Sequence, residues 1–391
     1  MTQTVEQIRN IALVTASHGR ELAAAIDDAI FAVRPDDAAE LTLYAERIRQ
    51  CSGESNIWYA EDLHKPDGEC FNGAGRFWYC GLRLCTSCAA RHATRNRLKL
   101  IGAVNRQQLL VNEHWKFITF TLVNPNLPIL ETRALFERAW QLFRKSTWFR
   151  STIRGLSKNE EFTVTAKGIH YHLHALAKAK YIHYDALRHH WTKAVLSAFA
   201  QAGRTLEIAT ADSMLIVKCK NVTSMRKAIK EVCKYITKGD SWSKIPPTDL
   251  LDVARIRRFP RMFELMGDLA LERAETPPSD EDEALNETIV HTTDISDESQ
   301  DRTWRDFVQT NGFVAAVERL MRQIDANYQF RTEQLKQKYP YANFKRINAP
   351  RDDARTRLLE RARVLDIITE PKKPEPLRWR FSGDNFVEVL N

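Results

Sequence analysis

Three histidines alternate with apolar or aromatic residues in the segment 168–176, at His170, His172 and His174. Because a β-strand has a side-chain period of two, a strand here would place all three imidazoles on one face of a sheet. The intervening side chains would fill the opposite face with apolar surface. Imidazoles are common ligands of divalent metal ions, so this spacing favours a metal-binding strand. The alternative is a half-exposed strand that only turns its polar residues outward.

A second group that could do chemistry lies in a helix expected over residues 223–238, which would end at Gly239. Glu231 and Tyr235 are four residues apart and Lys238 follows three later, so the three side chains would share one helical face. The Tyr235 phenol could act as a nucleophile, Glu231 as a base and Lys238 as an electrostatic helper. The alternative is an ordinary amphipathic helix in which the Tyr235 ring packs against the core.

A third group consists of cysteines. Cys80, Cys85 and Cys88 have a spacing that suits a zinc knuckle, because thiolates are soft ligands for tetrahedral zinc. A fourth ligand is required, and three residues carry a suitable side chain, namely Cys51, Cys70 and His92. The alternatives are free buried cysteines in a reducing compartment and, least favoured, a disulfide, since nothing marks the chain as secreted.

Composition and charge bound the possible functions. The chain has 391 residues, enough for two or three domains, and a net charge of +8, which favours a polyanionic partner such as DNA. No segment approaches the roughly 20 apolar residues of a membrane helix, and the N-terminus lacks the pattern of a signal peptide. We therefore expect a cytoplasmic protein that has no contact with membranes. No Gly-x-x-x-x-Gly-Lys loop is present, so we expect no ATP binding.

The positive charge is concentrated in particular segments. The basic side chains that we expect to contact DNA are Arg91, Arg95, Arg97, Lys99 and Lys234. Residues 133–158 interleave cations with aromatic residues, a combination that suits single-stranded nucleic acid. The aromatic residues of that stretch also form a helical stripe, so we expect most of them to be core and the arginines to face DNA.

Patterning divides the chain into five expected parts: a helical segment 1–50, a zinc-knuckle and basic region 51–105, a domain of mixed strands and helices 106–245, a helix followed by an acidic flexible linker 246–302, and a helical C-terminal region 303–391. No motif in the last part decides between recognition of a DNA site, binding of a partner protein and a scaffold role.

The middle of the chain predicts strands and helices without a strict βαβ rhythm, which indicates an α+β domain with an antiparallel sheet. The expected strands are 116–123, 161–166, 169–177 and 205–218, and the expected helices are 131–146, 184–202 and 223–238. Near the N-terminus, Asp37 and Glu40 predict a capping box for a helix that spans residues 38–50.

The order of these motifs resembles the HUH superfamily of single-strand DNA endonucleases, and most closely the rolling-circle replication initiators of small bacterial plasmids. Their first strand reads Thr-Leu-Thr-x-Pro-Asn, which is similar to residues 119–126 here. Their metal strand reads Trp-His-Pro-His-x-His, similar to residues 169–174, with a Glu-Val-Thr stretch before it that resembles residues 161–163. The chain departs from the metal-strand pattern at Ile169 and Tyr171. The resemblance covers about residues 51–240.

The resemblance implies a ferredoxin-like or RRM-like HUH nuclease sheet flanked by helices. In the metal site that it implies, His172 and His174 hold Mg²⁺ or Mn²⁺, with His170 or Glu161 completing the protein ligands. It also extends to the cysteines, where the family's Cys-x4-Cys-Pro-x-Cys segment is similar to residues 80–88 and an earlier family cysteine matches Cys51 loosely. The implied structural Zn²⁺ would therefore be held by four cysteines, namely Cys51, Cys80, Cys85 and Cys88.

The activity that the resemblance implies is nicking of single-stranded origin DNA by a single tyrosine, Tyr235. The reaction would leave a 5′-phosphotyrosine link and a free 3′-hydroxyl that primes a polymerase, while Glu231 activates water at termination. A host helicase and a host polymerase are the expected partners. Three alternatives stay open: an HUH transposase that acts on mobile-element ends, a metallohydrolase in which Tyr235 is structural, and a non-covalent zinc-bearing DNA-binding protein.

Overall fold

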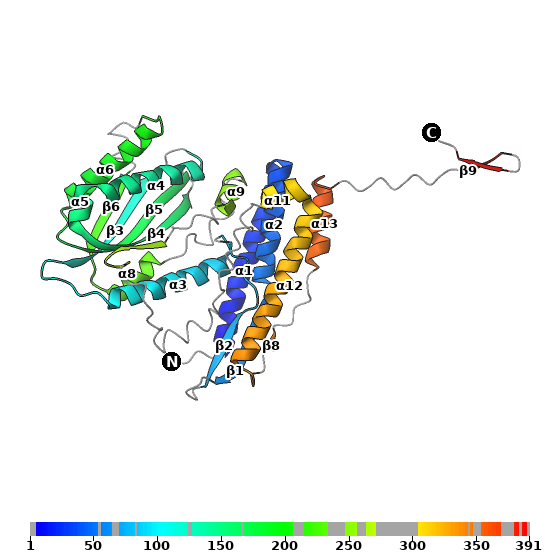
Figure 1. The fold of residues 1–391 in the computed structure, drawn as a ribbon, viewed down its shortest axis with the longest axis horizontal. Helices are drawn as coiled ribbons and strands as arrows, with labels where there is room; N and C mark the ends of the chain where they lie inside the picture. Colours follow the sequence, from blue (N-terminus) through cyan, green and yellow to red (C-terminus); the bar gives the residue numbers. More distant parts are fainter. Residues whose placement is uncertain are drawn as a thin grey trace.

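The structure, a computed structural model, describes most of the chain in two bodies, a helix-covered sheet and a helical bundle (Figure 1). The described residues are 5–53, 56–64, 70–82, 84–123, 127–165, 168–205, 215–233, 247–255, 263–270, 304–342, 345–346, 353–368, 379–382 and 385–388. Within them, no helix has both the length and the apolar character needed to cross a membrane.

The sheet body is built on five strands in the order β6-β3-β5-β4-β7, and every neighbouring pair is antiparallel. The strands are β3 (His114–Val123), β4 (Ile153–Thr165), β5 (Gly168–Ala179), β6 (Leu215–Asn221) and β7 (Phe263–Gly267). The predicted mixed α+β class with an antiparallel sheet is therefore confirmed. Alternation in β3 buries Ile118, Phe120 and Leu122 on one face of the sheet.

Helices α4 (Ile129–Lys145) and α6 (Tyr184–Gln201) cover that apolar face, with the short α5 (Thr147–Thr152) following α4. The ring of Phe120 lies 5.6 Å from that of Trp140 on α4 and 4.9 Å from that of Trp191 on α6, measured between centroids. The aromatic stripe predicted in residues 133–158 is therefore core at Phe136, Trp140 and Phe143. These packed rings anchor both helices to the sheet.

Two helices lie on the opposite face of the sheet, α3 (Thr86–Asn105) and α8 (Met225–Val232). The apolar residues of α8 form a small cluster with Leu176 of β5 and Leu100 of α3. Ser224 caps α8 by accepting a hydrogen bond from the backbone N–H of Lys227 at 3.4 Å. The helix predicted over residues 223–238 is described only as far as Val232. Residues 234–246, which include Lys234, Tyr235 and Lys238, lie outside the described residues.

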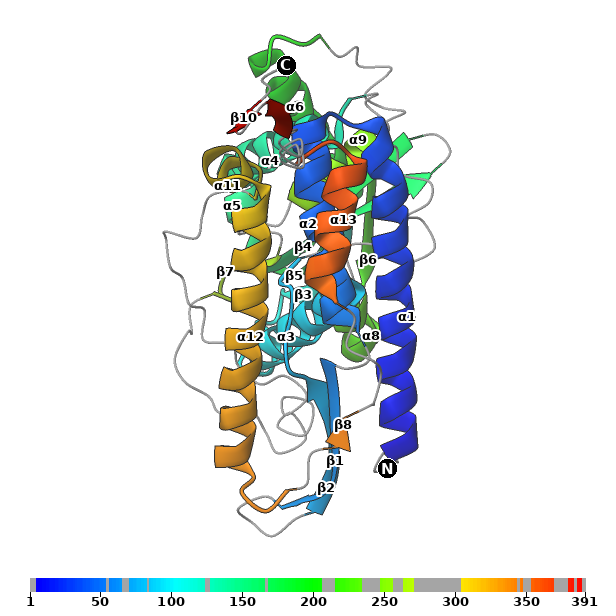
Figure 2. The same cartoon turned by 90° about the vertical axis from the view of Figure 1, so that its right-hand side faces the viewer.

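The helical bundle combines helices from the N-terminal and the C-terminal regions of the chain (Figure 2). Its helices are α1 (Val5–Ala29), the 3-10 turn η1 (Ile30–Ala32), α2 (Pro35–Ser52), α11 (Trp304–Asn311), α12 (Phe313–Lys338) and α13 (Ala354–Val364). Arg357 of α13 donates to Glu46 of α2 at 2.7 Å, and Arg361 lies 3.6 Å from Asp27 of α1. The helices described in the segments predicted as 1–50 and 303–391 therefore share one core.

The capping box predicted at Asp37 and Glu40 is wrong. Helix α2 begins earlier, at Pro35, with Arg34 as its N-cap and without a side-chain cap hydrogen bond. Proline suits this first position because its φ is already helical and its missing N–H would have no helical partner there. Asp37 instead forms ion pairs of 3.2 Å with Arg34 and with Arg305 of α11.

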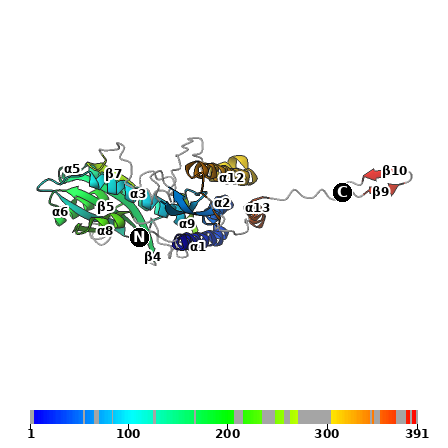
Figure 3. The same cartoon turned by 90° about the horizontal axis from the view of Figure 1, so that it is seen from below.

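The remaining elements are short. A three-stranded sheet in the order β2-β1-β8 flanks the bundle, and helix α9 lies between the two bodies (Figures 1 and 2). The α9 side chains Leu250, Leu251 and Val253 belong to one apolar core that continues from the bundle into the sheet body. A hairpin of β9 and β10 lies apart from both bodies (Figure 3). The bounds of these elements are Ile57–His64 (β1), Cys70–Arg76 (β2), Lys345–Arg346 (β8), Pro247–Arg255 (α9), Trp379–Ser382 (β9) and Asn385–Glu388 (β10).

Candidate active site

The histidine strand β5 lies in the interior of the sheet, between β3 and β4. His174 stands opposite Thr119 of β3, while His172 stands opposite Thr121 of β3 and Glu161 of β4. Directly opposed residues of antiparallel strands project from the same face. The register therefore places the two imidazoles, the two threonine hydroxyls and the Glu161 carboxylate on one face of the sheet, the face that lies away from α4 and α6.

Glu161, His172 and His174 bring their ligand atoms within 4.8 Å of one another. The Nε2 atom of His174 lies 3.3 Å from Oε2 of Glu161, and its Nδ1 atom lies 3.1 Å from the Thr119 hydroxyl. The Thr119 contact holds the ring so that Nε2 is turned toward the carboxylate, as outer-shell hydrogen bonds do at metal sites. Two imidazoles and one carboxylate form a donor set that fits a divalent ion such as Mn²⁺.

The third predicted histidine, His170, belongs to β5 by its backbone and pairs with Val123 and Thr163. Its side chain lies outside the described part of the structure. Of the two residues predicted to complete the ligand set, Glu161 is therefore the one that the structure places beside His172 and His174.

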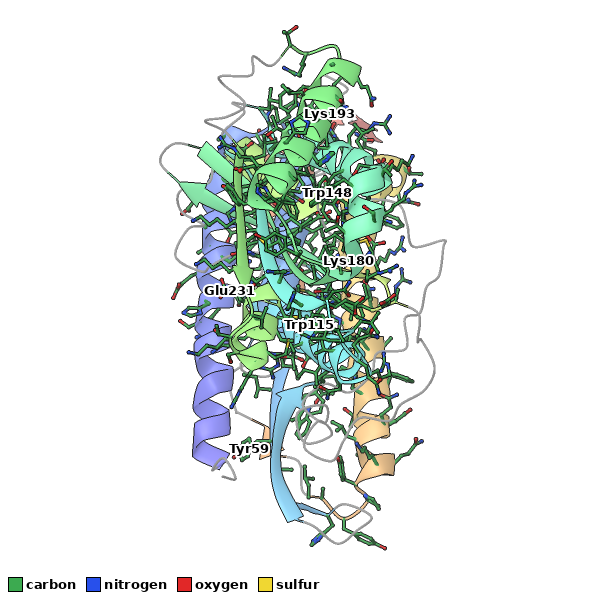
Figure 4. The ribbon with its side chains drawn as sticks, turned by 90° about the vertical axis from the view of Figure 1, so that its left-hand side faces the viewer. Tyr59, Trp115, Trp148, Lys180, Lys193 and Glu231 are labelled. Atoms are coloured by element: carbon green, nitrogen blue, oxygen red, sulfur yellow. The ribbon has the colours of Figure 1, made fainter. Side chains whose placement is uncertain are left out.

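Glu231 lies in the last turn of α8 and is half-buried (Figure 4). Helix α8 covers the same face of the sheet as the histidines, because it packs on Leu176, which shares the period-two face of His172 and His174. The described chain stops at Cys233, two residues before Tyr235. The structure thus places the predicted base on the histidine side, while the predicted nucleophile and Lys238 lie outside the described residues.

A second candidate metal centre lies at the junction of α2 and α3. The sulfur atoms of Cys51, Cys80, Cys85 and Cys88 all lie within 4.8 Å of one another, with 3.7 Å between Cys51 and Cys88 and 3.5 Å between Cys80 and Cys88. All four are buried free thiols. Four ligands at the zinc–sulfur distance of about 2.3 Å would lie about 3.8 Å apart in a tetrahedron. The observed spacing therefore fits a structural zinc ion.

The structure separates the three candidates for the fourth ligand of this centre. Cys51, in the last turn of α2, lies within the cluster, whereas His92 lies one turn further along α3 than Cys88. Cys70 begins β2, and its side chain lies outside the described residues. Cys51 is therefore the residue that completes a four-thiol set.

Buried arginines surround the cysteine cluster. Arg47 donates to the carbonyl oxygen of Cys80, and Arg76 donates to that of Cys51 at 2.7 Å. Burial raises the pKa of the Cys80 thiol, whereas hydrogen bonds from Cys51, Cys80 and Cys88 lower the pKa of Cys85. Four thiolates and one Zn²⁺ carry a net negative charge, which the guanidinium groups would offset. Sequence spacing does not reveal these arginines, since they come from α2 and β2.

A buried charge network lies beneath α4, on the opposite face of the sheet from the histidines. Lys158 and Glu160 of β4 are almost fully buried and lie 2.8 Å apart, and Arg133 of α4 lies 3.1 Å from Glu160. Tyr171, which stands between two histidines of β5, donates its hydroxyl to Glu160. The expectation that the arginines of 133–158 face DNA is therefore wrong for Arg133, because the buried Glu160 carboxylate requires a cation.

This network also contains Glu137 of α4, whose carboxylate lies 3.0 Å from Nζ of Lys158. Burial raises the pKa of Glu137 to about 7, and its hydrogen bond and charge repulsion with Glu160 act in the same direction. Burial alone would also raise the pKa of Glu160, but the hydrogen bond from Glu137 and the charges of Lys158 and Arg133 lower it to about 2. Glu137 is thus the carboxyl group of the network that holds a proton near neutral pH.

The predicted DNA-contacting residues Arg91, Arg95, Arg97 and Lys99 all lie on α3. Lys99 is exposed and the three arginines are half-buried, with the Arg91 guanidinium 4.5 Å from the centre of the Tyr79 ring. Burial raises the pKa of Cys233 to about 12, against the opposing charge of Arg97. The basic helix α3 therefore approaches the end of α8, from which the chain continues toward Tyr235.

The chain is similar to a known protein family. No curated protein and no solved structure matches the chain. The family model described as Replication protein matches residues 74–312, which is well over half of the chain and includes both candidate metal centres except Cys51. That match supports a replication protein of a rolling-circle plasmid. The chain therefore belongs to the replication protein family.

Proposed function

We propose that this protein initiates rolling-circle replication by nicking single-stranded origin DNA and forming a covalent link through Tyr235. The observation that carries the proposal is the group formed by Glu161, His172 and His174, whose ligand atoms lie within 4.8 Å on a sheet face that α8 also covers. A buried carboxylate beside two imidazoles is a poor structural core and a good site for a divalent cation. Membership of the replication protein family supports the same role.

The topology of the sheet body gives further support for an HUH nuclease. The chain runs β3–α4–α5–β4–β5–α6–β6, and the four strands are antiparallel neighbours in the order β6-β3-β5-β4. This succession agrees with the βαββαβ order expected of a ferredoxin-like fold, apart from one short extra helix, and so supports that part of the proposal. The two central strands, β3 and β5, carry Thr119, His172 and His174 of the candidate site.

The proposed ligands for Mn²⁺ or Mg²⁺ are Glu161, His172 and His174, with His170 as a further candidate. When bound, the ion would polarise a non-bridging oxygen of the scissile phosphate and fix its position. Thr119 holds His174 in the orientation that leaves Nε2 available. Imidazole ligands favour Mn²⁺, whereas Mg²⁺ prefers oxygen, so we expect Mn²⁺ to support the higher activity.

In the proposed first step the Tyr235 oxygen attacks the phosphorus atom in line, and the bond from phosphorus to the 3′ oxygen breaks. The phenol loses its proton, the DNA strand gains a free 3′-hydroxyl, and the 5′-phosphate remains bound to the tyrosine. One phosphodiester replaces another, so the bond energy is kept. Lys238 would stabilise the phenolate or the charge on the phosphate. The 3′-hydroxyl can then prime a host polymerase, after a host helicase opens the duplex.

The third motif holds one tyrosine, so a second cut needs another nucleophile. We propose that Glu231 removes a proton from water for this termination step. Water activated in this way would break the bond from phosphorus to the 3′ oxygen at the second cut, leaving a 5′-phosphate on one strand end and a 3′-hydroxyl on the other. That 3′-hydroxyl could then attack the phosphorus bound to Tyr235, which would rejoin the strand and return the tyrosine to its free phenol. The half-buried position of Glu231 in the last turn of α8, four residues before Tyr235, supports this role.

The cysteine cluster is proposed as a structural zinc centre that connects α2 to α3. Because α3 carries Arg91, Arg95, Arg97 and Lys99, zinc would fix the basic helix relative to the bundle. These four side chains and Lys234 are the proposed contacts to the DNA backbone.

A labelled single-stranded oligonucleotide from the replication origin, incubated with Mn²⁺, tests the proposal. We expect a nicked strand and a protein–DNA adduct that survives denaturing electrophoresis. Tyr235→Phe should abolish both products and keep DNA binding, while Glu231→Gln should nick normally but accumulate the adduct at termination. Cleavage without an adduct would instead identify a metallohydrolase, and an unchanged adduct in Tyr235→Phe would remove the tyrosine from the mechanism.

The same atoms in a transposase would act on the ends of a mobile element. The family match favours the replication role. Preferential nicking of transposon-end strands over origin strands would reverse that choice.

A further inference from the structure

The edge strand β6 and the helix that follows it form a basic segment that the proposed mechanism does not use. Between residues 213 and 230 the sequence contains five cations and no Asp or Glu. All five cationic side chains are exposed, namely Lys218, Lys220, Arg226, Lys227 and Lys230. A segment that holds this much positive charge in water, without an acidic residue of its own, attracts polyanions.

The strand register places the two lysines of β6 on the histidine face. Lys218 stands opposite Thr119, which stands opposite His174, and the contact between the Thr119 hydroxyl and the His174 ring shows which face this row occupies. Lys220 stands opposite Phe117, whose ring stacks on that of His174 at 5.6 Å. Neighbouring strands lie about 4.8 Å apart, so Lys218 is about 10 Å from His174 across the sheet.

The alternate residues of β6 confirm this assignment of faces. Val217 is buried in the core that contains Phe120 and Trp191, under α4 and α6, and Cys219 packs against the same core. Because successive residues of a strand point to opposite faces, Lys218 and Lys220 must project from the other side.

Helix α8 extends the basic surface. Its buried residues Ala228, Ile229 and Val232 face Leu176 on the histidine side of the sheet. Its remaining face is exposed and carries the three other cations of the segment, Arg226, Lys227 and Lys230. Strand β6 therefore borders the candidate metal site at the edge of the sheet, while α8, which contacts β5 and β4, adds exposed positive charge on the same face.

We propose that the single strand next to the cleavage site runs along β6, with successive phosphates bound by Lys218 and Lys220. This inference rests on the proposed nicking function and adds to it the path of the substrate strand. The half-buried rings of Trp115 and Phe117 lie on the same face, and aromatic rings beside cations suit unstacked bases. Duplex DNA offers no accessible base faces, so we expect a preference for the single strand.

Lysines on an edge strand have a second physical role, since they prevent the strand from pairing with other chains. That role would not require the two lysines to share the histidine face, and it would not change the affinity for DNA. The test must therefore measure binding and oligomeric state in the same variants.

The experiment measures fluorescence anisotropy of a labelled oligodeoxythymidylate strand with the full-length protein over a range of salt concentrations. Lys218→Gln and Lys220→Gln are compared with Lys193→Gln, an exposed lysine of α6 on the opposite side of the sheet (Figure 4). We expect each β6 variant to lower the slope of log affinity against log salt by about 0.7, and the affinity about fivefold near 0.1 M salt. The Lys193 variant should bind as the wild type does.

The nicking assay separates this inference from the proposed function. For nicking of an origin strand, we expect the β6 variants to raise KM with little change in kcat and in the Mn²⁺ dependence. Wild-type nicking with unchanged DNA affinity in both β6 variants would overturn the proposed strand path and leave the nuclease intact. Weaker binding by the β6 variants, in a protein that never forms an adduct, would overturn the nuclease and keep the DNA surface. Equal losses in the Lys193 variant, or aggregation of the β6 variants alone, would also overturn the inference.

Discussion

His174 shows how one side chain is prepared for metal binding by its neighbours. Its Nδ1 atom contacts the Thr119 hydroxyl at 3.1 Å, and its ring stacks on Phe117. The ring is therefore held from two directions before any ion binds. Such outer-shell contacts commonly affect metal affinity by about 10- to 100-fold when they are removed.

Thr119→Val tests this arrangement at the scale of one residue. We expect the Mn²⁺ concentration that gives half-maximal nicking to rise about tenfold, because the ring loses its orienting hydroxyl while the ligands remain. The measurement is a metal titration of the nicking rate, with Thr94→Val on α3 as a control. A lower maximal rate without a change in metal dependence would contradict the orienting role.

The cysteine cluster gives a second residue-scale prediction. The native protein should contain about one zinc ion per chain by elemental analysis, and Cys51→Ser should lose most of it. Cys219→Ser is the matched control, since Cys219 is a half-buried cysteine of β6 that is not part of the cluster. Wild-type protein that stays folded and active after complete removal of zinc would contradict a structural centre.

Much of the candidate site could be predicted from residue types and spacing. The alternation of histidines placed His172 and His174 on one face, and the cysteine spacing selected three of the four thiols that cluster. The contacts of Arg47 and Arg76 with the cysteine carbonyls could not be predicted, because each arginine comes from an element distant in sequence. Resemblance rather than spacing selected Cys51 over its two rivals.

At the scale of elements, strands with clear hydrophobic alternation were predicted correctly. A strand segment that carries buried charged residues was not, because the charges interrupt the alternation. The strands expected at 116–123 and 169–177 are the cores of β3 and β5. The strand expected at 161–166 is the end of a longer one, β4, which begins at Ile153. Lys158 and Glu160 are buried in the first part of β4, so that stretch lacks the apolar pattern of a buried strand. Strand β7 was missed because it has only five residues and pairs with β4, which is distant in sequence.

The Glu137–Glu160 network predicts a pH dependence of stability. The pKa of Glu137 is raised by burial to about 7, so the folded protein keeps a proton that the unfolded chain releases near pH 4.5. Between about pH 4.5 and about pH 7 Glu137 therefore holds more protons in the folded state than in the unfolded chain, and its contribution to the free energy of unfolding falls as the pH rises.

Glu137→Gln isolates this contribution, because glutamine keeps the neutral donor and cannot ionise. In urea denaturation, we expect the variant to gain stability relative to the wild type as the pH rises through that window. Glu131→Gln removes a more exposed carboxylate from the same helix and serves as the control. A Glu137 variant that loses stability relative to the wild type toward neutral pH would contradict the assignment.

At the scale of the whole molecule, the N-terminal helices α1 and α2 and the C-terminal helices α11, α12 and α13 form one bundle. The side chain of Glu46, in α2, is 1% exposed and receives two arginines, Arg49 from its own helix and Arg357 from α13. The cysteine cluster follows directly in α2, at Cys51. The C-terminal helices therefore support the element that leads into the proposed zinc centre. Local sequence patterns could predict these helices but not their long-range pairing.

Arg357→Gln tests this long-range pairing. It should lower the free energy of unfolding by about 1–3 kcal/mol, because it leaves a buried carboxylate with one fewer charged donor. The neighbouring Arg355 pairs with Glu318 at 2.6 Å, but both side chains are largely exposed, so Arg355→Gln should change stability little. Equal effects of the two substitutions in urea denaturation would contradict a structural role for the α2–α13 contact.

The proposed reaction requires a divalent ion on the histidine strand and a tyrosine beyond the end of α8 to act on the same phosphate. The most direct test is the mass of the proteolytic peptide that contains Tyr235, after reaction with an origin strand and Mn²⁺. We predict a mass increase equal to that of the 5′-phosphorylated DNA fragment less one water, which His172→Ala and His174→Ala abolish although both variants still bind DNA. An unmodified Tyr235 peptide in a wild-type reaction that cleaves the strand would contradict the claim.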